Sequence, residues 1–517
     1  MKKKIRPLFI GLYDAKLLGI RYLSTTLKKH GYETTLIFLK DFNSYNVDEP
    51  TAAEYALLYE KIRALNPDYI GISIMCSFYL GVAEKIAKDL KEAIPGALII
   101  TGGAYPTLFP ERCLNFCDAV FRGESEAAIV EFTNALERGL PYDAIANVAT
   151  KTQDGACKIN PPGPLAARLD ELPHPDFGGD NKYYINNSKI ERADPEAKSI
   201  SYETTTSRGC PNRCSYCSAG SIREIYSGHG KYIRQRGVGD VIAEIKSVRE
   251  KNPGVQLLRF WDEIFPWDKN WVRDFAEAYK KEIGLPFEAW GHPKLSAGPQ
   301  MKMLKEAGLS KIVVGVQSGC PKIRKEIYLR NETQEEILEC AKSLSEAKIP
   351  IVVYDFILGH PFETEEDLRA TLELCRKLAK PYRLQLHGLS FLPGTPIEEI
   401  AVSRGVKTWD EIREEQSKPL REQYRAMHWW RSGRGGEQNA EKVYWYTLIY
   451  LCQFKTGELI IKKALKKEKW KSDSRALLRI HRIYNNALML KVGTRKLAFI
   501  AKRKLATVLR KVTSKGD

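Results

Sequence analysis

Two successive series of strand and helix patterns dominate this chain of 517 residues. In each series, short apolar runs alternate with stretches in which apolar residues recur at helical spacing. Parallel strands need crossover helices between them, so each series predicts a parallel β-sheet covered by helices. The first series occupies residues 1–150 and the second occupies residues 200–400. We therefore expect an α/β protein with two separate sheets.

The first series predicts an open sheet with helices on both faces, a doubly wound, Rossmann-like arrangement. The expected strands are Arg6–Leu12, Thr34–Leu39, Tyr69–Met75, Ala97–Thr101 and Ala119–Arg122, and the expected helices include Leu17–His30 and Val82–Ala93. Ligands of such sheets bind beyond the carboxyl ends of the strands. Small and polar residues gather at these ends, and we expect them to converge on one rim where a ligand binds. They are Ser73, Ser77, Gly102, Gly103, Gly123 and Glu124.

The second series predicts six strands, each followed by helical periodicity. The expected strands are Ile200–Ser207, Leu257–Asp262, Phe287–Trp290, Ile312–Val316, Ile351–Leu358 and Arg383–Phe391. Six such units favour a partial (β/α)6 barrel of the TIM type, in which the chemistry takes place at the carboxyl ends of the strands.

Three cysteines follow the first of these six strands with the spacing Cys-x3-Cys-x2-Cys. They are Cys210, Cys214 and Cys217. A structural zinc site needs a fourth ligand, and no Cys or His follows at the spacing of a zinc finger. Three thiolates on one tight loop suit a [4Fe–4S] cluster with one iron free of protein ligands, where a small molecule can bind. A disulfide knot and a partial zinc site are the alternatives.

Composition places these thiols in a reducing compartment. The chain contains eleven cysteines, and its basic start lacks a small-residue cleavage site, so we do not expect a secretory signal. The sequence contains no run of eighteen or more apolar residues, so we expect no membrane-spanning helix. These observations predict a cytoplasmic protein whose cluster is sensitive to oxygen, so that anaerobic handling matters.

The cysteine spacing, with Tyr216 before the last cysteine, resembles that of the radical S-adenosylmethionine (SAM) family. Two later stretches are similar to motifs of the same family. The stretch Phe260-Trp261-Asp262-Glu263 stands where the family binds the SAM amino group, which implies Asp262 and Glu263 as SAM-binding residues. The stretch from Gly315 to Gly319 resembles a Gly-Ile-Glu-Ser-Gly segment that lines the adenosyl pocket, which implies Gln317 and Ser318; here glutamine replaces glutamate.

The first series resembles the cobalamin-binding domain that is attached to many radical SAM enzymes. The likeness lies in the order of Gly-Ile-Ser-x-Met, Thr-Gly-Gly-Ala-Tyr-Pro-Thr and Arg-Gly-Glu-Ser-Glu. One departure is clear, because the nearest match to the Asp-x-His-x-x-Gly motif of methionine-synthase-type domains has Lys16 in place of the histidine. A protonated lysine cannot ligate cobalt. We expect either cobalt without a protein ligand on its lower face or, less favoured, a domain that has lost the cofactor.

The resemblance implies an enzyme that binds a [4Fe–4S] cluster, SAM and cobalamin and receives electrons from a donor such as flavodoxin or ferredoxin. The implied reaction is methylation of an unactivated carbon of a small-molecule or lipid-like substrate, through a 5′-deoxyadenosyl radical. A cyclase or oxidoreductase of the same architecture is one alternative, and a cobalamin- or SAM-sensing module is another. The motifs identify no catalytic residue beyond the cofactor sites.

The remaining segments are a connector and a helical end. Proline and polar residues in 151–199 predict a connector, and residues 401–517 are expected to be helical, with an aromatic stripe that we interpret as core. Residues 461–517 hold 18 Lys and Arg against 3 acidic residues, whereas the rest of the chain is close to neutral. This basic amphipathic tail either lies peripherally on an anionic membrane or packs on the barrel. No nucleic-acid motif accompanies the charge, so we expect no nucleic acid partner.

Overall fold

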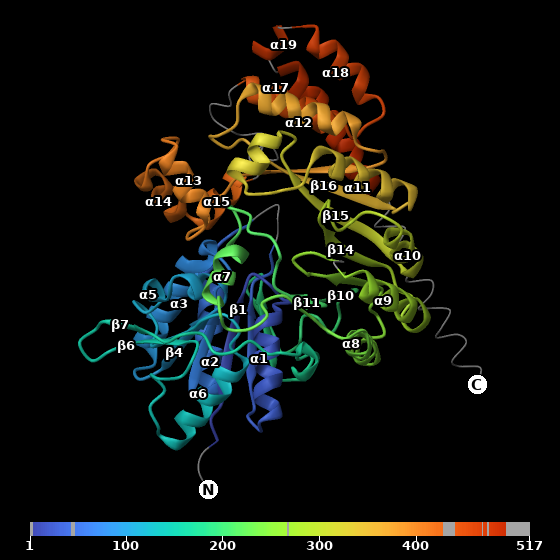
Figure 1. Ribbon diagram of the computed structural model, residues 1–517. Helices are drawn as coiled ribbons and strands as arrows, with labels where there is room; N and C mark the ends of the chain where they lie inside the picture. The colour runs from blue at the N-terminus through green and yellow to red at the C-terminus, as the bar shows by residue number, and fades with distance from the viewer. Residues whose placement is uncertain are drawn as a thin grey trace.

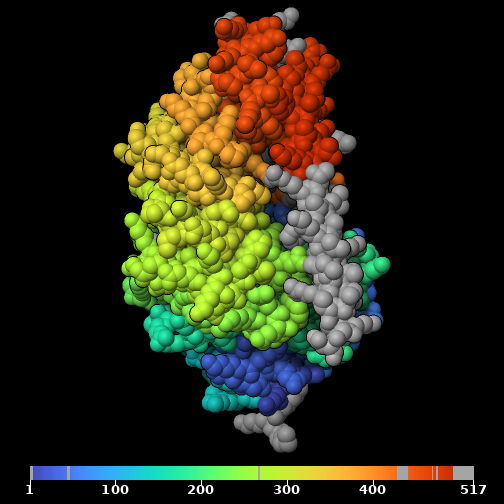
Figure 2. Space-filling view, turned by 90° about the vertical axis from the view of Figure 1, so that its right-hand side faces the viewer, coloured from blue at the N-terminus to red at the C-terminus, as the bar shows by residue number. Residues whose placement is uncertain are grey.

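The computed structural model describes residues 4–42, 47–265, 268–427, 440–467, 469–472 and 475–492. The N-terminal α/β domain lies at one end of the molecule, a half-open barrel lies in the middle, and helices of the C-terminal region cover the other end (Figure 1). Figure 2 shows the same order from a second side, with the barrel segment between the two ends.

The N-terminal domain is built on a nine-stranded sheet of order β7-β6-β5-β4-β3-β1-β2-β8-β9. Its six central strands, from β5 to β8, are parallel, whereas β6, β7 and β9 pair antiparallel with their neighbours. The strands are β1 (Pro7–Leu12), β2 (Thr35–Leu39), β3 (Tyr69–Ser73), β4 (Leu98–Gly102), β5 (Ala119–Phe121), β6 (Val148–Lys151), β7 (Cys157–Ile159), β8 (Lys182–Asn186) and β9 (Lys189–Glu191). All five strands predicted for this part of the chain are present.

Helices cover both faces of this sheet, which confirms the doubly wound arrangement. Helices α1 (Leu18–Lys29) and α6 (Glu126–Arg138) pack on one face around Phe38, Ile100 and Phe132. Helices α2 (Ala52–Leu65) and α3 (Leu80–Ala93) pack on the other face. Three shorter elements follow the strands, namely η1 (Ser77–Tyr79), α4 (Ala104–Leu108) and α5 (Pro110–Cys113).

The barrel sheet contains six parallel strands in chain order, as the six predicted units require. They are β10 (Ser201–Thr204), β13 (Leu257–Phe260), β14 (Phe287–Gly291), β15 (Leu309–Gln317), β16 (Ile351–Leu358) and β17 (Arg383–Gly388). The covering helices are α8 (Val238–Lys251), α9 (Lys269–Glu282), α10 (Gln300–Ala307), α11 (Gln334–Glu346) and α12 (Glu365–Lys377). A π-helical turn, η3 (Ile323–Ile327), follows β15, and the short strands β11 (Ser207–Arg208) and β12 (Arg234–Gln235) pair beside the cluster loop. This arrangement confirms the partial barrel.

The segment 151–199, predicted as a connector, returns to the first sheet before the chain enters the barrel. It contributes β7, β8, β9 and the short turn η2 (Leu169–Glu171), and β8 pairs in parallel with β2 over Leu36–Leu39. Arg21 of α1 forms a buried ion pair with Asp194 at 2.8 Å, which fixes the end of this segment to the sheet. We therefore propose that the first structural domain extends to about residue 194. The predicted boundary at residue 150 marks only the end of the first strand–helix series.

The C-terminal region is helical, as predicted. Its helices are α13 (Pro396–Ser403), α14 (Trp409–Ser417), α15 (Leu420–Met427), α17 (Ala440–Leu451), α18 (Gly457–Leu465) and α19 (Lys469–Ser472), and residues 475–492 are also helical. The aromatic stripe on α17 is buried in the barrel core, where Trp445 is 1% exposed. Trp429, Trp430 and the amphipathic stretch 497–512 lie outside the described residues. Within the described helices, none is long and apolar enough to cross a bilayer.

Candidate functional site: a chamber between two cofactor domains

The three cysteines of the motif lie on one loop between β11 and helix α7 (Ser218–Ile225). Ser215 anchors this loop, because its backbone N–H donates to the carbonyl of Tyr328 at 3.1 Å and its hydroxyl donates to the carbonyl of Ile327 at 2.5 Å. Ser215 is fully buried, whereas all three cysteines are partly accessible and free of disulfides. The loop is thus held rigidly at its centre and presents its thiols at the mouth of the barrel.

The thiols fit a cubane cluster better than a single metal ion. Among the residues that the structure describes, no group of three His, Cys, Asp or Glu side chains converges on one ion. In a cubane, each cysteine binds a different iron, so the three thiols need not meet at a point. Burial raises the pKa of Cys210 to about 11 and that of Cys217 to about 12, so metal binding has to replace the thiol protons.

A buried cation lies against this loop and was not evident from the sequence. Arg330 approaches the sulfur of Cys214 to 3.7 Å and donates to the hydroxyl of Tyr216 at 3.2 Å. It is fixed by Glu332 at 2.5 Å. Burial alone would raise the pKa of Glu332, but its hydrogen bonds with His292 and Arg330 lower it to about 2. The arrangement places a permanent positive charge where cysteine thiolates carry negative charge.

Asp262 and Glu263, both predicted to bind SAM, have different surroundings. The Asp262 carboxylate is buried and accepts hydrogen bonds from the backbone and hydroxyl of Thr206 and from the hydroxyl of Ser207, at 2.5–3.1 Å. It therefore orders the chain that leads into the cluster loop. Glu263 lines the cavity between the domains, and burial raises its pKa, with the charge of Asp262 as a second cause. Glu263 is the member of the pair that is available to a ligand.

Gln317 and Ser318, predicted for the adenosyl pocket, lie at the end of β15. Gln317 adopts a left-handed backbone conformation with φ of +69°, and its amide lies over Gly315, where a Cβ would come within 2.6 Å of Nε2. Ser318 is fully buried and accepts a hydrogen bond from the N–H of Cys320, so it belongs to the turn.

Asp355 on β16 lies directly opposite Gly315 in the sheet and was missed by sequence reasoning. Its Oδ1 atom is buried and has no hydrogen-bond partner among the described residues, and the nearest basic group is the Nε2 atom of His387 at 4.0 Å. Burial raises the pKa of Asp355 to about 7. Together with the Gln317 amide, it offers a pair of polar groups at one place on the barrel wall.

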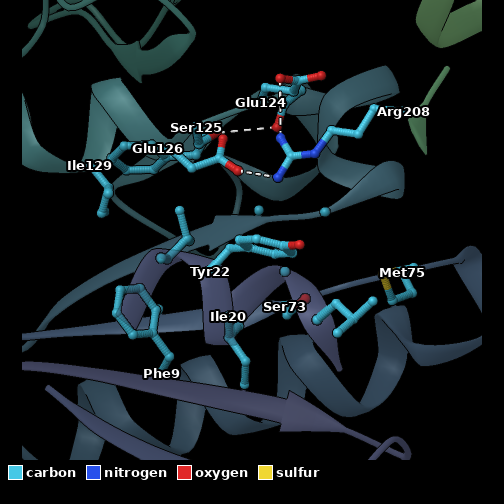
Figure 3. Close-up of a pocket in the computed structure, with 18 of the residues that line it drawn as sticks. Phe9, Ile20, Tyr22, Ser73, Met75, Glu124, Ser125, Glu126, Ile129 and Arg208 are labelled. Carbon is cyan, nitrogen blue, oxygen red and sulfur yellow. Dashed lines mark hydrogen bonds and ion pairs between the residues drawn. The ribbon is translucent and has the colours of Figure 1, made fainter. Parts of the chain in front are cut away.

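A cavity of about 370 Å³ opens between the rim of the first sheet and the cluster loop (Figure 3). On one wall it is lined by five of the six predicted rim residues, and Ser77 does not line it. On the other wall it is lined by Thr205, Ser207, Arg208, Gly209, Trp261 and Glu263 from the barrel. Its inner end is apolar and reaches Phe9, Gly71, Ile100 and Ile129 within the sheet. The cavity thus extends from the rim to Gly209, at the start of the cluster loop, and to Glu263. The other predicted barrel-site residues do not line it, namely Cys210, Cys214, Cys217, Asp262, Gln317 and Ser318.

Two rim glycines serve the packing of the chain itself. Gly103 has φ of +114°, and a Cβ there would lie 2.6 Å from the carbonyl oxygen of Ile74. Gly123 has φ of +65°, and a Cβ there would lie 1.9 Å from the hydroxyl of Tyr226, which comes from the barrel side. The absence of a side chain at these positions is therefore required by backbone and domain contacts, in addition to any role beside a ligand.

Ion pairs join the cluster loop to the rim. Arg208, two residues before Cys210, pairs with Glu124 at 3.1 Å and with Glu126 at 2.6 Å, and its guanidinium lies 5.0 Å above the centre of the Tyr22 ring (Figure 3). Arg234 of β12 also pairs with Glu124. Glu124, predicted as a rim residue, thus pairs with two arginines of the barrel domain and links the rim to the start of the cluster loop.

Lys16, which stands where a cobalt-ligating histidine would stand, reaches away from the cavity. Its Nζ atom lies 2.8 Å from Glu203 and 2.9 Å from the hydroxyl of Ser201, both on β10. It is absent from the cavity lining, to which the nearby residues Leu18 and Gly19 at the start of α1 contribute. The lysine is therefore a contact between the domains.

The fold and this chamber define a class of enzyme in which a Rossmann-like cofactor domain closes over a barrel with a three-cysteine cluster loop. The family models agree: a B12 binding domain matches residues 12–133, and the radical SAM superfamily matches residues 204–375. The chain is thus a radical SAM enzyme with an N-terminal B12 binding domain. This assignment confirms the predicted cofactor set of cobalamin, SAM and an iron–sulfur cluster.

Two curated relatives and one solved structure illustrate the similarity. An uncharacterized methyltransferase of Pyrococcus horikoshii is 28% identical over 67% of this chain and 72% of its own length. The cytidylyl-2-hydroxyethylphosphonate methyltransferase of Streptomyces wedmorensis is 25% identical over 74% of this chain and 76% of its own. The cobalamin-dependent SAM radical enzyme OxsB, solved with aqua-cobalamin and SAM, aligns over 95% of this chain and 80% of its own, with a TM-score of 0.66 and 14% identity.

Proposed function

We propose that this protein is a cobalamin-dependent radical SAM methyltransferase that acts on an unactivated carbon of a small molecule. The observation that carries the proposal is the continuous cavity between the rim of the B12 binding domain and the cluster loop. When bound, the cluster and SAM supply the radical that activates a C–H bond, and cobalamin supplies the methyl group. Both must reach one carbon, and a shared chamber provides that geometry.

The residues of the chamber fit the proposed cofactors. The apolar inner end of the cavity, lined by Phe9, Gly71, Ile100 and Ile129, suits a heteroaromatic group such as the nucleotide tail of cobalamin. We assign the rim residues Ser73, Gly102 and Glu124 to the corrin side of the chamber. Lys16 is held by Glu203, so we assign no protein ligand from this position to the lower face of cobalt.

We assign SAM to the barrel mouth beside the cluster loop. Cys210, Cys214 and Cys217 would bind the cluster, and Arg330 would offset its negative charge. Glu263 is accessible for the amino group of SAM. Gln317 offers an amide for hydroxyl groups, and Asp355 offers a carboxyl whose Oδ1 atom has no hydrogen-bond partner among the described residues. The chain's own contribution is to orient both ligands, to exclude water at the buried end of the chamber and to hold the two domains together.

The test uses the full chain, reconstituted with iron and sulfide under anaerobic conditions and supplied with hydroxocobalamin, SAM and a reductant. We expect uptake of one cobalamin, formation of 5′-deoxyadenosine, and a product that is heavier by one methyl group. Product without added mass would identify the alternative, a cyclase or oxidoreductase of the same architecture. A protein that binds the cofactors but forms no 5′-deoxyadenosine would be the sensing module.

Two partners complete the proposal. A reductant must deliver electrons to the cluster, and we propose a small donor such as flavodoxin or ferredoxin. We also keep the proposal that the basic tail contacts an anionic membrane surface, which rests on composition, because residues 493–517 lie outside the described part. Cosedimentation with anionic and neutral liposomes, with a chain that ends at Gly493 as the control, tests the second of these proposals.

A further inference from the structure

The concave face of the barrel sheet carries polar and aromatic side chains instead of the aliphatic residues that fill closed barrels. On β13, Leu258 and Phe260 pack into the core beneath the helices, so Arg259, and Trp261 directly after the strand, project from the opposite face. Arg259 bonds to Glu203 of β10 and to Glu288 of β14, each at 3.0 Å. The polar and aromatic side chains on this face could therefore contact a ligand.

Two tryptophans at the top of this face form a rigid pair. The rings of Trp261 and Trp290 stack with centroids 4.0 Å apart and planes at 22°. The indole N–H of Trp261 donates to Glu203 at 2.5 Å, and Glu203 is in turn held by Arg259 and Lys16. The hydrogen bond to Glu203 thus fixes the Trp261 ring at its edge, and the stacking on Trp290 fixes it on one face.

The residue Trp261 is nevertheless 47% exposed, and it lines the cavity between the two cofactor domains. Tryptophan is usually largely buried, and an indole that is both fixed and accessible inside a chamber offers a flat surface for stacking. The ring stands on the barrel wall, opposite the rim residues assigned to the corrin. Trp261 belongs to the stretch that resembles the SAM-binding motif, but the side chain assigned to the amino group of SAM is that of Glu263, which leaves the indole ring available.

We propose that Trp261, supported by Trp290, is a platform for a planar conjugated ring of the substrate. This inference rests on the proposed function, because it places the ring between the two cofactors. It also specifies the substrate class: a molecule with a flat π system that carries a hydrogen-bond acceptor. Arg259, two residues away on the same face, is the donor for that acceptor, because among the described residues its Nη2 atom has no hydrogen-bond partner and its side chain is 33% exposed.

The experiment compares two probes that share a skeleton and a carboxylate but differ in planarity, naphthalene-2-carboxylate and decahydronaphthalene-2-carboxylate. Binding to the full chain loaded with hydroxocobalamin is measured by titration calorimetry. Aromatic stacking predicts that the planar probe binds about five- to ten-fold more tightly. Trp261→Leu should abolish this preference, whereas Trp409→Leu should keep it, because Trp409 is similarly exposed, at 42%, but lies on α14 away from the cavity.

Cobalamin uptake is measured on the same samples by absorbance. Unchanged uptake in Trp261→Leu, together with loss of the planar preference, supports the platform. Equal binding of the two probes to the unmodified chain, or a preference that survives Trp261→Leu, would overturn it. Reduced cobalamin uptake in Trp261→Leu would also overturn it, because the ring would then be a cofactor contact. Absence of cobalamin uptake in the unmodified chain would instead refute the proposed function, whatever the probes do.

Discussion

Replacement of Arg208 by methionine should destabilise the contact between the two domains that surround the cavity. Arg208 and Glu126 have side chains only 21% and 13% exposed, and their atoms lie 2.6 Å apart. Burial alone would raise the pKa of Glu126, but the charge of Arg208 keeps it below its usual value. Without the arginine, Glu126 remains buried and unpaired, whereas Glu124 keeps Arg234.

The expected loss of stability follows from the burial of Glu126 without its ion-pair partner. Truncation of one partner of a fully buried pair costs about 3–5 kcal/mol. Because this pair is partly accessible, we expect about 2 kcal/mol for Arg208→Met, measured as the loss of stability in the first transition of urea unfolding. Addition of Glu126→Gln to the Arg208→Met variant should recover part of this loss of stability, because it removes the unpaired charge.

The matched control is Arg192→Met, whose ion pair with Asp180 is 63% and 89% exposed. Exposed pairs contribute about 0–1 kcal/mol, so this variant should unfold almost like the unmodified chain. The reasoning is refuted if the effects of Arg208→Met and Glu126→Gln simply add to within about 0.5 kcal/mol, because a coupled buried pair cannot give additive losses.

Three further outcomes are expected. Cys214→Ala should lose the iron and sulfide that Cys340→Ala retains, since Cys340 is buried in the barrel core; equal iron contents in chemical analysis would contradict this assignment. Lys16→Ala should leave the absorption spectrum of bound cobalamin unchanged, and a shifted spectrum would place the lysine at cobalt. Burial raises the pKa of Glu363 to about 8 from 4.5, so its folded form binds a proton more tightly than its unfolded form. Its contribution to stability is therefore present below pH 4.5 and lost as the pH rises through 8, and Glu363→Gln should flatten the fall in urea midpoint between pH 5.5 and 8.5.

Much of the fold could be predicted because its strands are short apolar runs bounded by helical periodicity. The run Ile351–Leu358 was predicted to the residue, since six of its eight residues are buried and all except Asp355 are aliphatic or aromatic. Helix α2 was not predicted, although Thr51 and Glu54 form a capping box at its start. Strand β8 could not be predicted, because it lies in a polar stretch and forms only by pairing with β2, a distant partner in the sequence.

For the candidate site, the sequence indicated the residues that belong to local motifs. The cysteines and the rim glycines follow predicted strands at fixed spacing, so these patterns can be recognised in the sequence alone. The roles of Lys16 and Arg208 depend on contacts between the two domains, and the role of Trp261 depends on its contacts with Trp290 and Glu203 on neighbouring strands. The spacing of residues along the sequence does not predict such contacts. Asp355 was missed although a carboxylate in an otherwise aliphatic and aromatic strand is visible in the sequence; the burial of its Oδ1 atom without a hydrogen-bond partner is evident only in the structure.

The return of residues 182–191 to the first sheet has a practical consequence. A fragment ending at Lys151 would keep every motif of the B12 binding domain, yet it would leave β2 as an exposed sheet edge. The residues of β2 are Thr-Leu-Ile-Phe-Leu, and four of the five are fully buried in the intact chain. A flat apolar edge with unpaired amides recruits other chains, so such a fragment should aggregate. A fragment that continues past Asp194 should stay monomeric, and light scattering distinguishes the two.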